Sequence, residues 1–183
     1  HLPVLVEEVC ALLRGNPEGT VLDATVGCGG HAEALLSRRT AARLEGRDAD
    51  PEMIRLAAAR LAPFGARASL EHGRFSALGA SREPLAAALF DLGLNSAQLD
   101  DPSRGFSFRG EGDLDMRYDR RGGPDAAEWL SRARAPDLED VLRRLGGERY
   151  AGRVARAVLR ARDAGRLRTT QDLADAVRAA VPG

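Results

Sequence analysis

The fold is decided by Thr20-Val-Leu-Asp-Ala-Thr-Val-Gly-Cys-Gly-Gly-His31. The mostly apolar run from Thr20 to Ala24 predicts a short buried strand, and the glycines after it predict a tight turn. Helix-forming residues follow directly, from Ala32 to Leu36. In an α/β fold, a strand, a glycine-rich turn and a helix in this order present backbone N–H groups and a helix N-terminus to a ligand. The stretch therefore predicts an α/β protein with a ligand site where this strand ends.

Two aspartates stand where such a site needs acidic groups. Asp23 ends the first strand, and Asp48 ends the next candidate strand, about 20 residues after the glycines, where an acidic residue commonly binds a ribose hydroxyl. The turn reads Gly-x-Gly-Gly and lacks the Gly-Lys-Ser/Thr of a phosphate-binding P-loop, so by itself it also fits a tight turn that binds nothing. The spacing to Asp48 favours a nucleoside-containing cofactor, either a dinucleotide or S-adenosylmethionine.

Three further apolar runs complete the predicted sheet, at residues 42–48, 68–71 and 85–90. Asp50-Pro51 begins the helix after the first of these runs, with the aspartate as N-cap and the proline at the first helical position. The order β-α-β-α-β-β predicts a parallel sheet. In such sheets, ligands bind beyond the carboxyl ends of the strands.

The composition suits one globular domain, or one domain with a small insert, in a chain of 183 residues. Basic and acidic residues are equal in number, 27 each, so no overall positive charge indicates a nucleic-acid partner, although a local patch would suffice. Cys10 and Cys28 lie far apart without metal-ligand spacing, so we expect neither a disulfide framework nor a metal site. Neither a signal peptide nor an apolar run of about 18 residues is apparent, which predicts no membrane span.

The second half of the chain has a different character. Residues 101–123 are rich in Gly, Arg, Asp and Pro, and a loop of this length is usually functional or disordered; its varied sequence favours function. Within this loop, Phe106 and Phe108 either stack on an extruded base or pack beneath the loop. From Asp125 onward the pattern is helical.

Arginines recur along one of these helices. They step by four, three and four residues and therefore share one face, at Arg149, Arg153, Arg156 and Arg160. This face is either a phosphate-binding stripe or a solvated surface balanced by nearby acidic residues. The last helix is predicted to begin with a capping box at residues 169–172.

A series of motifs resembles, in order, the motifs of one known family, the MraW-type (RsmH-like) small-subunit ribosomal RNA (cytosine-N4) methyltransferases. The matching pieces are residues 1–9 (His-Leu-Pro-Val-Leu-Val-Glu-Glu-Val), 23–31, 48–51, 73–76, 91–93, 96–108, 114–117 (Leu-Asp-Met-Arg), 126–130 and 147–150 (Gly-Glu-Arg-Tyr). They cover essentially the whole chain.

The resemblance implies a class I (Rossmann-like) S-adenosylmethionine-dependent methyltransferase core with an inserted helical subdomain. Residues 1–105 would form the N-terminal part of the core, and residues 106–183 the loop and the helical insertion. Because the family continues beyond Gly183, the C-terminal strands of the core are expected to be missing from this chain. The methyl donor would be S-adenosyl-L-methionine, and the acceptor N4 of a cytidine in small-subunit (16S-type) ribosomal RNA.

By motif position, the resemblance implies cofactor contacts at Gly29, Gly30, His31, Asp48, Phe75, Asp91 and Gln98. The glycines would expose backbone to the methionine part of the cofactor. Asp48 would bind the ribose, Phe75 would lie against the adenine, and Asp91 and Gln98 would close the pocket. Taken alone, Phe75 is equally consistent with a core residue, and Gln98 with a surface residue.

The residues after the fourth predicted strand, Asp91, Asn95 and Ser96, are the candidate catalytic groups. The lone pair of the cytosine amine is delocalised into the ring, so this nitrogen is a poor nucleophile. Acceptors that hydrogen-bond its N–H atoms hold the amine in place and localise the lone pair, and proximity to the sulfonium methyl supplies much of the remaining catalysis.

The chain departs from the family pattern in three respects. Asn95 replaces the first of two serines, the connection between Phe75 and Asp91 is shorter than usual, and Glu45 and Arg47 stand in a normally apolar strand. Asn95 and the shorter connection support an alternative, a non-catalytic RNA-binding or ribosome-assembly module that retains the methyltransferase fold. A dinucleotide-dependent oxidoreductase is the other alternative, and the sequence offers no evident hydride-transfer residues for it.

The expected partner is small-subunit ribosomal RNA, with a homodimer as a candidate assembly. The expected location is the bacterial cytoplasm, or a mitochondrion or plastid if the source is eukaryotic.

Overall fold

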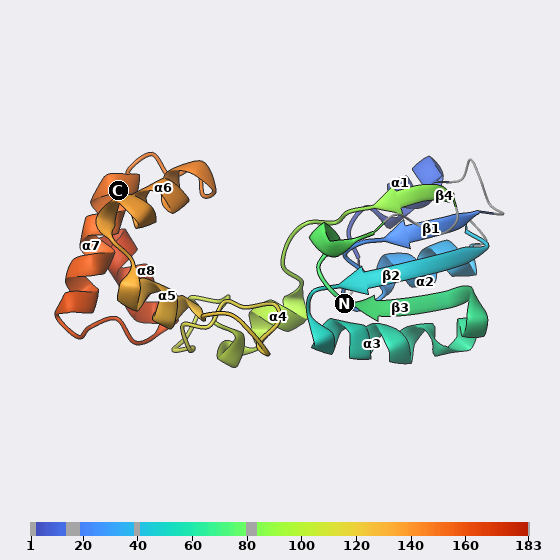
Figure 1. The fold of residues 1–183 in the computed structure, drawn as a ribbon, viewed down its shortest axis with the longest axis horizontal. Coiled ribbons are helices and arrows are strands. Elements are labelled where there is room, and N and C mark those ends of the chain that lie inside the picture. The colour runs from blue at the N-terminus through green and yellow to red at the C-terminus, as the bar shows by residue number, and fades with distance from the viewer. Residues whose placement is uncertain (1–2, 14–18, 39–40, 80–83, 183) are drawn as a thin grey trace. The chain divides into compact units, whose positions relative to one another are not determined.

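The computed structural model describes residues 3–13, 19–38, 41–79 and 84–182, which fold as two compact units (Figure 1). The units are His1–Asn95 and Ser96–Gly183, and each has its own hydrophobic core. The first two residues of the N-terminal motif, and part of the short connection between Phe75 and Asp91, lie outside the described residues. The predicted division after residue 105 stays a prediction.

The first unit contains a four-stranded parallel sheet, which confirms the predicted α/β class. Its strands are β1 (Thr20–Asp23), β2 (Arg43–Asp48), β3 (Ala68–His72) and β4 (Leu85–Leu89), in the spatial order β3-β2-β1-β4 (Figure 1). This is the order of the first four strands of the doubly wound, Rossmann-like arrangement. Since all four strands run parallel, their carboxyl ends meet at one edge of the sheet.

Three helices of the first unit share one core with β1 and β2. They are α1 (Val6–Leu12), α2 (Gly30–Ser37) and α3 (Pro51–Leu61). The core residues are Cys10, Val21, Val26, Ala32, Leu35, Leu36, Ala41, Leu44, Ala57 and Leu61. At the start of α3, the side chain of Asp50 accepts a hydrogen bond from the backbone N–H of Glu52 at 3.0 Å, which confirms the predicted N-cap.

Strand β2 accommodates the two charged residues that seemed unsuited to it. Arg47 is buried, ion-paired with Glu71 of the neighbouring β3, and donates a hydrogen bond to the carbonyl oxygen of Arg74 at 3.3 Å. Glu45 lies at an exposed position of the same strand. A buried guanidinium is tolerated only with such partners, so the pairing across β2 and β3 explains how a charged sequence forms an inner strand.

The second unit is helical. Its helices are α4 (Ser96–Asp100), α5 (Ala126–Arg132), α6 (Ala135–Arg144), α7 (Ala151–Asp163) and α8 (Thr170–Arg178). Its core consists of Leu130, Leu138, Val154, Ala155, Val158, Leu159 and Ala180. Throughout the described part of the chain, in both units, no helix has the length and apolar character needed to cross a bilayer.

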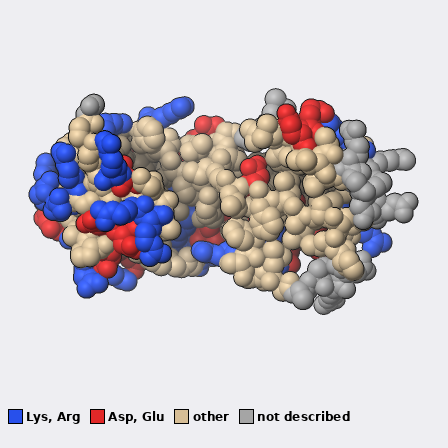
Figure 2. Space-filling view, turned by 90° about the horizontal axis from the view of Figure 1, so that it is seen from above, with Lys and Arg blue, Asp and Glu red and all other residues tan. Residues whose placement is uncertain are grey.

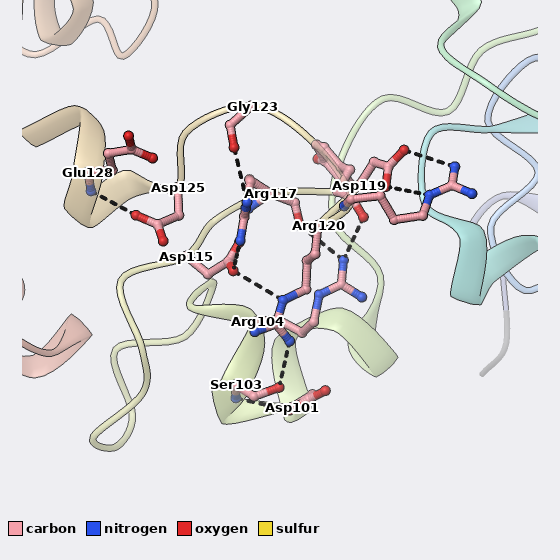
Figure 3. Close-up of polar contacts among 12 residues, drawn as sticks. Asp101, Ser103, Arg104, Asp115, Arg117, Asp119, Arg120, Gly123, Asp125 and Glu128 are labelled. Atoms are coloured by element: carbon pink, nitrogen blue, oxygen red, sulfur yellow. Dashed lines mark hydrogen bonds and ion pairs between the residues drawn. The ribbon is translucent and has the colours of Figure 1, made fainter.

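The loop between α4 and α5 is ordered by a polar network centred on Asp115 (Figure 3). The Asp115 carboxylate accepts hydrogen bonds from Arg117 Nη2 at 2.7 Å, Arg117 Nε at 2.9 Å and Arg120 Nε at 3.1 Å. The buried Arg104 guanidinium donates to two carbonyl oxygens of the same loop, at 3.1 and 3.0 Å. The Leu-Asp-Met-Arg motif therefore supplies the side chains that hold this loop in shape.

The same loop is tied to the start of α8. Asp113 and Thr169 form an antiparallel bridge, and Thr170 donates its backbone N–H to the carbonyl oxygen of Gly112 at 2.9 Å. Phe106 packs on Tyr118 with ring centroids 5.4 Å apart, so the packing alternative is confirmed for this ring. Phe108 is 62% exposed.

We expect Thr169→Ala to lower the free energy of unfolding of the second unit by about 1 kcal/mol, because it removes one half of a capping box. The Thr169 hydroxyl accepts the Asp172 N–H at 3.2 Å, and the Asp172 carboxylate accepts the Thr169 N–H at 2.9 Å. Urea unfolding followed by the fluorescence of Trp129, the single tryptophan, measures the change. Thr169→Ser keeps the hydroxyl and serves as the control; equal stability of the alanine variant would contradict the expectation.

Candidate cofactor site

Three aspartates gather at the carboxyl edge of the sheet. Asp23 is the last residue of β1, Asp48 is the last residue of β2, and Asp91 follows shortly after β4. The register of the sheet places Asp23 beside both β2 and β4. The sequence predicted a site at this edge, and the fold brings its acidic residues together there.

Two N–H groups of the glycine turn are used internally. The backbone N–H of Gly27 donates to Asp48 Oδ2 at 2.8 Å, and that of Gly29 donates to the carbonyl oxygen of Val26 at 2.8 Å. The other Asp48 oxygen accepts the Asp50 N–H at 2.9 Å. Burial is the main reason why the pKa of Asp48 lies above its usual value. This turn is therefore held by a carboxylate of the protein and differs from a loop whose amides await a phosphate.

Asp23 is the most deeply buried of the three carboxyl groups. It is 1% exposed, and its Oδ1 accepts a single long hydrogen bond from the Thr25 N–H at 3.3 Å. Burial raises the pKa of Asp23 to about 6, and the nearby Asp48 and Asp91 act in the same direction. In the described part of the chain, no arginine forms an ion pair with Asp23. A cationic group of a ligand would therefore stabilise its ionised form.

His31 links the N-terminal segment to the site. Its Nε2 lies 2.7 Å from the carbonyl oxygen of Val4, so this nitrogen carries the hydrogen, and its Nδ1 lies 3.8 Å from Asp91 Oδ2. Next to it, Gly30 packs so closely against Pro3 that a side chain at position 30 would meet the proline ring at 2.9 Å. Gly29 has a φ of +80° and caps α2, a conformation that favours glycine.

The segment after β4 is fixed from the first strand. The Thr25 hydroxyl accepts a hydrogen bond from the backbone N–H of Asp91 at 2.7 Å. The side chain of Asp91 is 49% exposed. The Asn95 amide nitrogen donates a hydrogen bond to Met53 Sδ at 2.9 Å. The same nitrogen lies 3.8 Å from the place where a Cβ atom would stand if residue 27 were not glycine. Two of the predicted catalytic residues, Asp91 and Asn95, thus stand at the same edge as the glycine turn.

An exposed aromatic pair lies beyond β3 and β4. Phe75 is 44% exposed, and its ring meets the ring of Phe90 edge to face, with centroids 5.7 Å apart. A ring this exposed offers a surface on which a planar base could stack. Its partner Phe90 immediately precedes Asp91, so the aromatic surface adjoins the acidic edge.

The two remaining predicted site residues, Ser96 and Gln98, belong to α4 of the second unit. Gln98 is 3% exposed, and Ser96 is partly buried. Their roles in binding and catalysis stay predictions.

Two residues with evident structural roles in this site were not singled out from the sequence. They are Thr25, which fixes Asp91, and Met53, which contacts Asn95. The contacts of Thr25 and Met53 span 66 and 42 residues, and no local pattern announces such contacts.

The chain is similar to known proteins over its whole length. A protein named ribosomal RNA small subunit methyltransferase H from Acidothermus cellulolyticus is 44% identical over 190 residues, which cover 100% of this chain and 58% of that protein. Proteins of the same name from Nitratidesulfovibrio vulgaris and Gloeobacter violaceus are 44% and 43% identical to this chain. Both matches include 100% of this chain, and they include 58% and 57% of the two relatives, respectively. The chain thus spans less than two thirds of these relatives.

Solved structures show only partial similarity. The YcgJ protein of Bacillus subtilis superimposes on 40% of this chain and 31% of its own, with a TM-score of 0.36 and 23% identity, which is too limited to support an argument. The family comparison is decisive, because the model described as the MraW methylase family matches residues 1–183. The chain belongs to the MraW methylase family.

Proposed function

We propose that this chain is part of an S-adenosylmethionine-dependent methyltransferase that modifies N4 of a cytidine in small-subunit ribosomal RNA. The names of its relatives support methylation of small-subunit ribosomal RNA. The cofactor and the cytidine N4 position are our inference from the site and from the motifs. The relatives are bacterial proteins, so we also propose the bacterial cytoplasm as the location; a homodimer stays a prediction.

The observation that carries the proposal is an acidic site in which two amides of the glycine turn, those of Gly27 and Gly29, are already hydrogen-bonded. A dinucleotide brings a pyrophosphate, which needs unengaged N–H groups and is repelled by carboxylates. S-adenosylmethionine brings an ammonium group, a sulfonium group and one carboxylate, for a net positive charge, and no phosphate. The amides of Gly27 and Gly29 are engaged, and Asp23 is a buried carboxyl without an arginine partner in the described residues. The site therefore favours the cationic cofactor over the dinucleotide.

Each part of this cofactor has a counterpart among the residues of the site. Asp48 would accept the ribose hydroxyls, Phe75 would stack on the adenine, and Asp23 would face the ammonium. His31 would lie beside the Asp91 carboxylate, with Nδ1 3.8 Å from Oδ2. The bound cofactor would supply the methyl group, and the protein would orient the acceptor beside it.

The acceptor amine would lie near Asp91 and Asn95, with Ser96 behind them. The Asn95 amide nitrogen is directed to Met53, so its oxygen is the atom that could accept a hydrogen bond from the amine. Asp91 is exposed enough to do the same. These acceptors would hold the amine in line with the methyl group and stabilise the positive charge that develops on nitrogen.

Calorimetric titration with S-adenosylhomocysteine tests the cofactor assignment. We expect Asp48→Ala to weaken binding about tenfold or more, because it removes a charged acceptor from the ribose and from the Gly27 N–H. Glu45→Ala is the matched control, since Glu45 is an exposed acidic residue of the same strand. If the folded parent chain does not bind this ligand, the methyltransferase proposal fails; if it binds and a completed protein never methylates ribosomal RNA, the non-catalytic alternative holds.

We expect Asn95→Ala to lower the rate of methyl transfer about tenfold without weakening the binding of S-adenosylhomocysteine, because one acceptor for the amine is lost. Single-turnover transfer of labelled methyl groups to small-subunit ribosomal RNA measures the rate. Asn95→Ser, which restores the residue type usual in the family, is expected to remain active. An unchanged rate in the alanine variant would remove Asn95 from the catalytic set.

A further inference from the structure

One face of α7 carries arginines that form no ion pair with the described residues of the second unit. Arg153, Arg156 and Arg160 are exposed along about 10 Å of this helix, and Arg149 extends the row beyond its N-terminus. The opposite face of α7 is buried in the core through Val154 and Val158. We call the four arginines the α7 arginine row.

The α7 arginine row differs from the other exposed arginines of the neighbouring helices. Those arginines form ion pairs within one turn, between Arg132 and Glu128 (2.6 Å), Arg134 and Asp137 (2.7 Å), Arg143 and Glu139 (2.6 Å), and Arg144 and Asp140 (3.2 Å). In the described part of the chain, no member of the row forms such a pair. Figure 2 shows this mixture of basic and acidic side chains over the helical unit. The row is therefore a local concentration of positive charge in a chain whose net charge is zero.

Part of the row is held in place. The guanidinium of Arg149 lies 4.7 Å from the centroid of the Tyr150 ring, and that of Arg153 lies 5.7 Å from it. Arg149 also donates a hydrogen bond to the Tyr150 hydroxyl. Stacking on one ring limits the freedom of both arginine side chains, so less conformational entropy is lost when they bind a ligand.

We propose that the α7 arginine row binds the phosphate backbone of the substrate RNA, and that it does so independently of cofactor binding. One guanidinium group can donate two parallel hydrogen bonds to two oxygens of a phosphate. Arginines that recur every three or four residues along one face of a helix can therefore contact successive phosphates of one strand. This proposal rests on the proposed function, which makes RNA the polyanion that the protein meets. It assigns the helical unit to holding the RNA and leaves recognition of the base to other residues.

The test compares two charge-matched variants of the 183-residue chain. The first variant replaces all four arginines of the row with Gln, at Arg149, Arg153, Arg156 and Arg160. The second variant replaces four ion-paired arginines with Gln, at Arg132, Arg134, Arg143 and Arg144. Fluorescence anisotropy with a labelled fragment of small-subunit ribosomal RNA gives the association constant at several salt concentrations. In a plot of log K against log salt concentration, we expect the magnitude of the negative slope to fall by about 3 in the first variant and to stay nearly unchanged in the second.

The outcomes separate this proposal from the proposed function. Equal slopes for the parent and the first variant, with Trp129 fluorescence unchanged, would overturn the proposal. A second result would also overturn the proposal: the parent chain binds polyglutamate as tightly as RNA, and the first variant loses the binding of polyglutamate but keeps that of RNA. The row would then bind an acidic protein. Binding of S-adenosylhomocysteine is expected to stay within twofold of the parent value in both variants; its absence in the parent would count against the proposed function and leave the RNA result standing.

Discussion

Replacing Asp23 with asparagine is expected to stabilise the first unit by about 2 kcal/mol at pH 8 and to weaken the binding of S-adenosylhomocysteine about tenfold or more. Both effects have one cause. Asp23 is 1% exposed and its pKa is raised to about 6 by burial. The ionised carboxylate is therefore costly in the free protein, and the same carboxylate is the group that a cationic ligand would stabilise.

The pH dependence follows from the direction of this shift. A carboxyl group whose folded pKa lies above its unfolded value binds more protons in the folded state, so its contribution to stability is present at low pH and is lost as the pH rises from about 4 to about 6. The stability gain of Asp23→Asn should accordingly disappear at pH 4. Because the first unit contains neither Trp nor Tyr, hydrogen exchange of the β1 backbone is the appropriate measurement.

Ligand binding should show the complementary dependence. Below pH 6 the affinity of the parent chain for S-adenosylhomocysteine is expected to fall, by at most about tenfold per pH unit, until it reaches that of the asparagine variant. The affinity of the asparagine variant should change little over this range, because it lacks the titrating carboxyl group. Glu45→Gln, at an exposed position of β2, controls for the loss of a negative charge. A parent and an Asp23→Asn variant with the same pH profile and the same affinity would exclude Asp23 from ligand binding.

Asp115→Asn should have the opposite effect on stability, lowering the free energy of unfolding of the second unit by about 2 kcal/mol at pH 7. The carboxylate is 5% exposed and accepts hydrogen bonds from two arginines, so the variant removes the counter-charge of the partly exposed Arg117 and Arg120 guanidinium groups (Figure 3). Hydrogen bonding to Arg117 lowers the pKa of Asp115 to about 2. This stabilisation is present above pH 4 and is lost as the pH falls towards 2.

Urea unfolding followed by Trp129 fluorescence reports on this unit, because Trp129 packs against its core. Asp175→Asn is the control, since Asp175 is an exposed aspartate that pairs with Arg178 on α8. The two variants should differ in stability at pH 7 and converge near pH 2. If Asp115→Asn were as stable as the control at pH 7, the network would have no part in ordering the loop.

The sequence was sufficient for the elements that follow local rules. The glycine turn, the Asp50 N-cap and the Thr169 capping box each involve residues within a few positions of one another, so their patterns are visible in the chain. The parallel direction of the strands follows from the alternation of strands and helices, whereas their spatial order was not predicted. The gathering of Asp23, Asp48 and Asp91 follows in turn, because parallel strands place their carboxyl ends at one edge.

The contacts that span the fold could not be predicted in this way. The Arg47–Glu71 pair joins two strands, and it converts a charged sequence that seemed poorly suited to a strand into a stable one. The hydrogen bond between the His31 ring and the Val4 carbonyl oxygen joins residues that are 27 positions apart. The partners of Asp115 lie close in sequence, but their arrangement depends on a loop without helix or strand periodicity.

The hydrogen bond from the Gly27 amide to Asp48 bears on competition inside a cell. ATP and NAD contain the same adenosine as the proposed cofactor, and both are abundant nucleotides. A pocket selected for adenosine alone would be blocked by them. Because this turn directs the amides of Gly27 and Gly29 to its own acceptors, and carboxylates line the rest of the edge, a phosphate chain would meet three carboxyl groups and would compete for these two amides. We therefore expect the protein to keep its proposed cofactor in the presence of a large excess of adenine nucleotides.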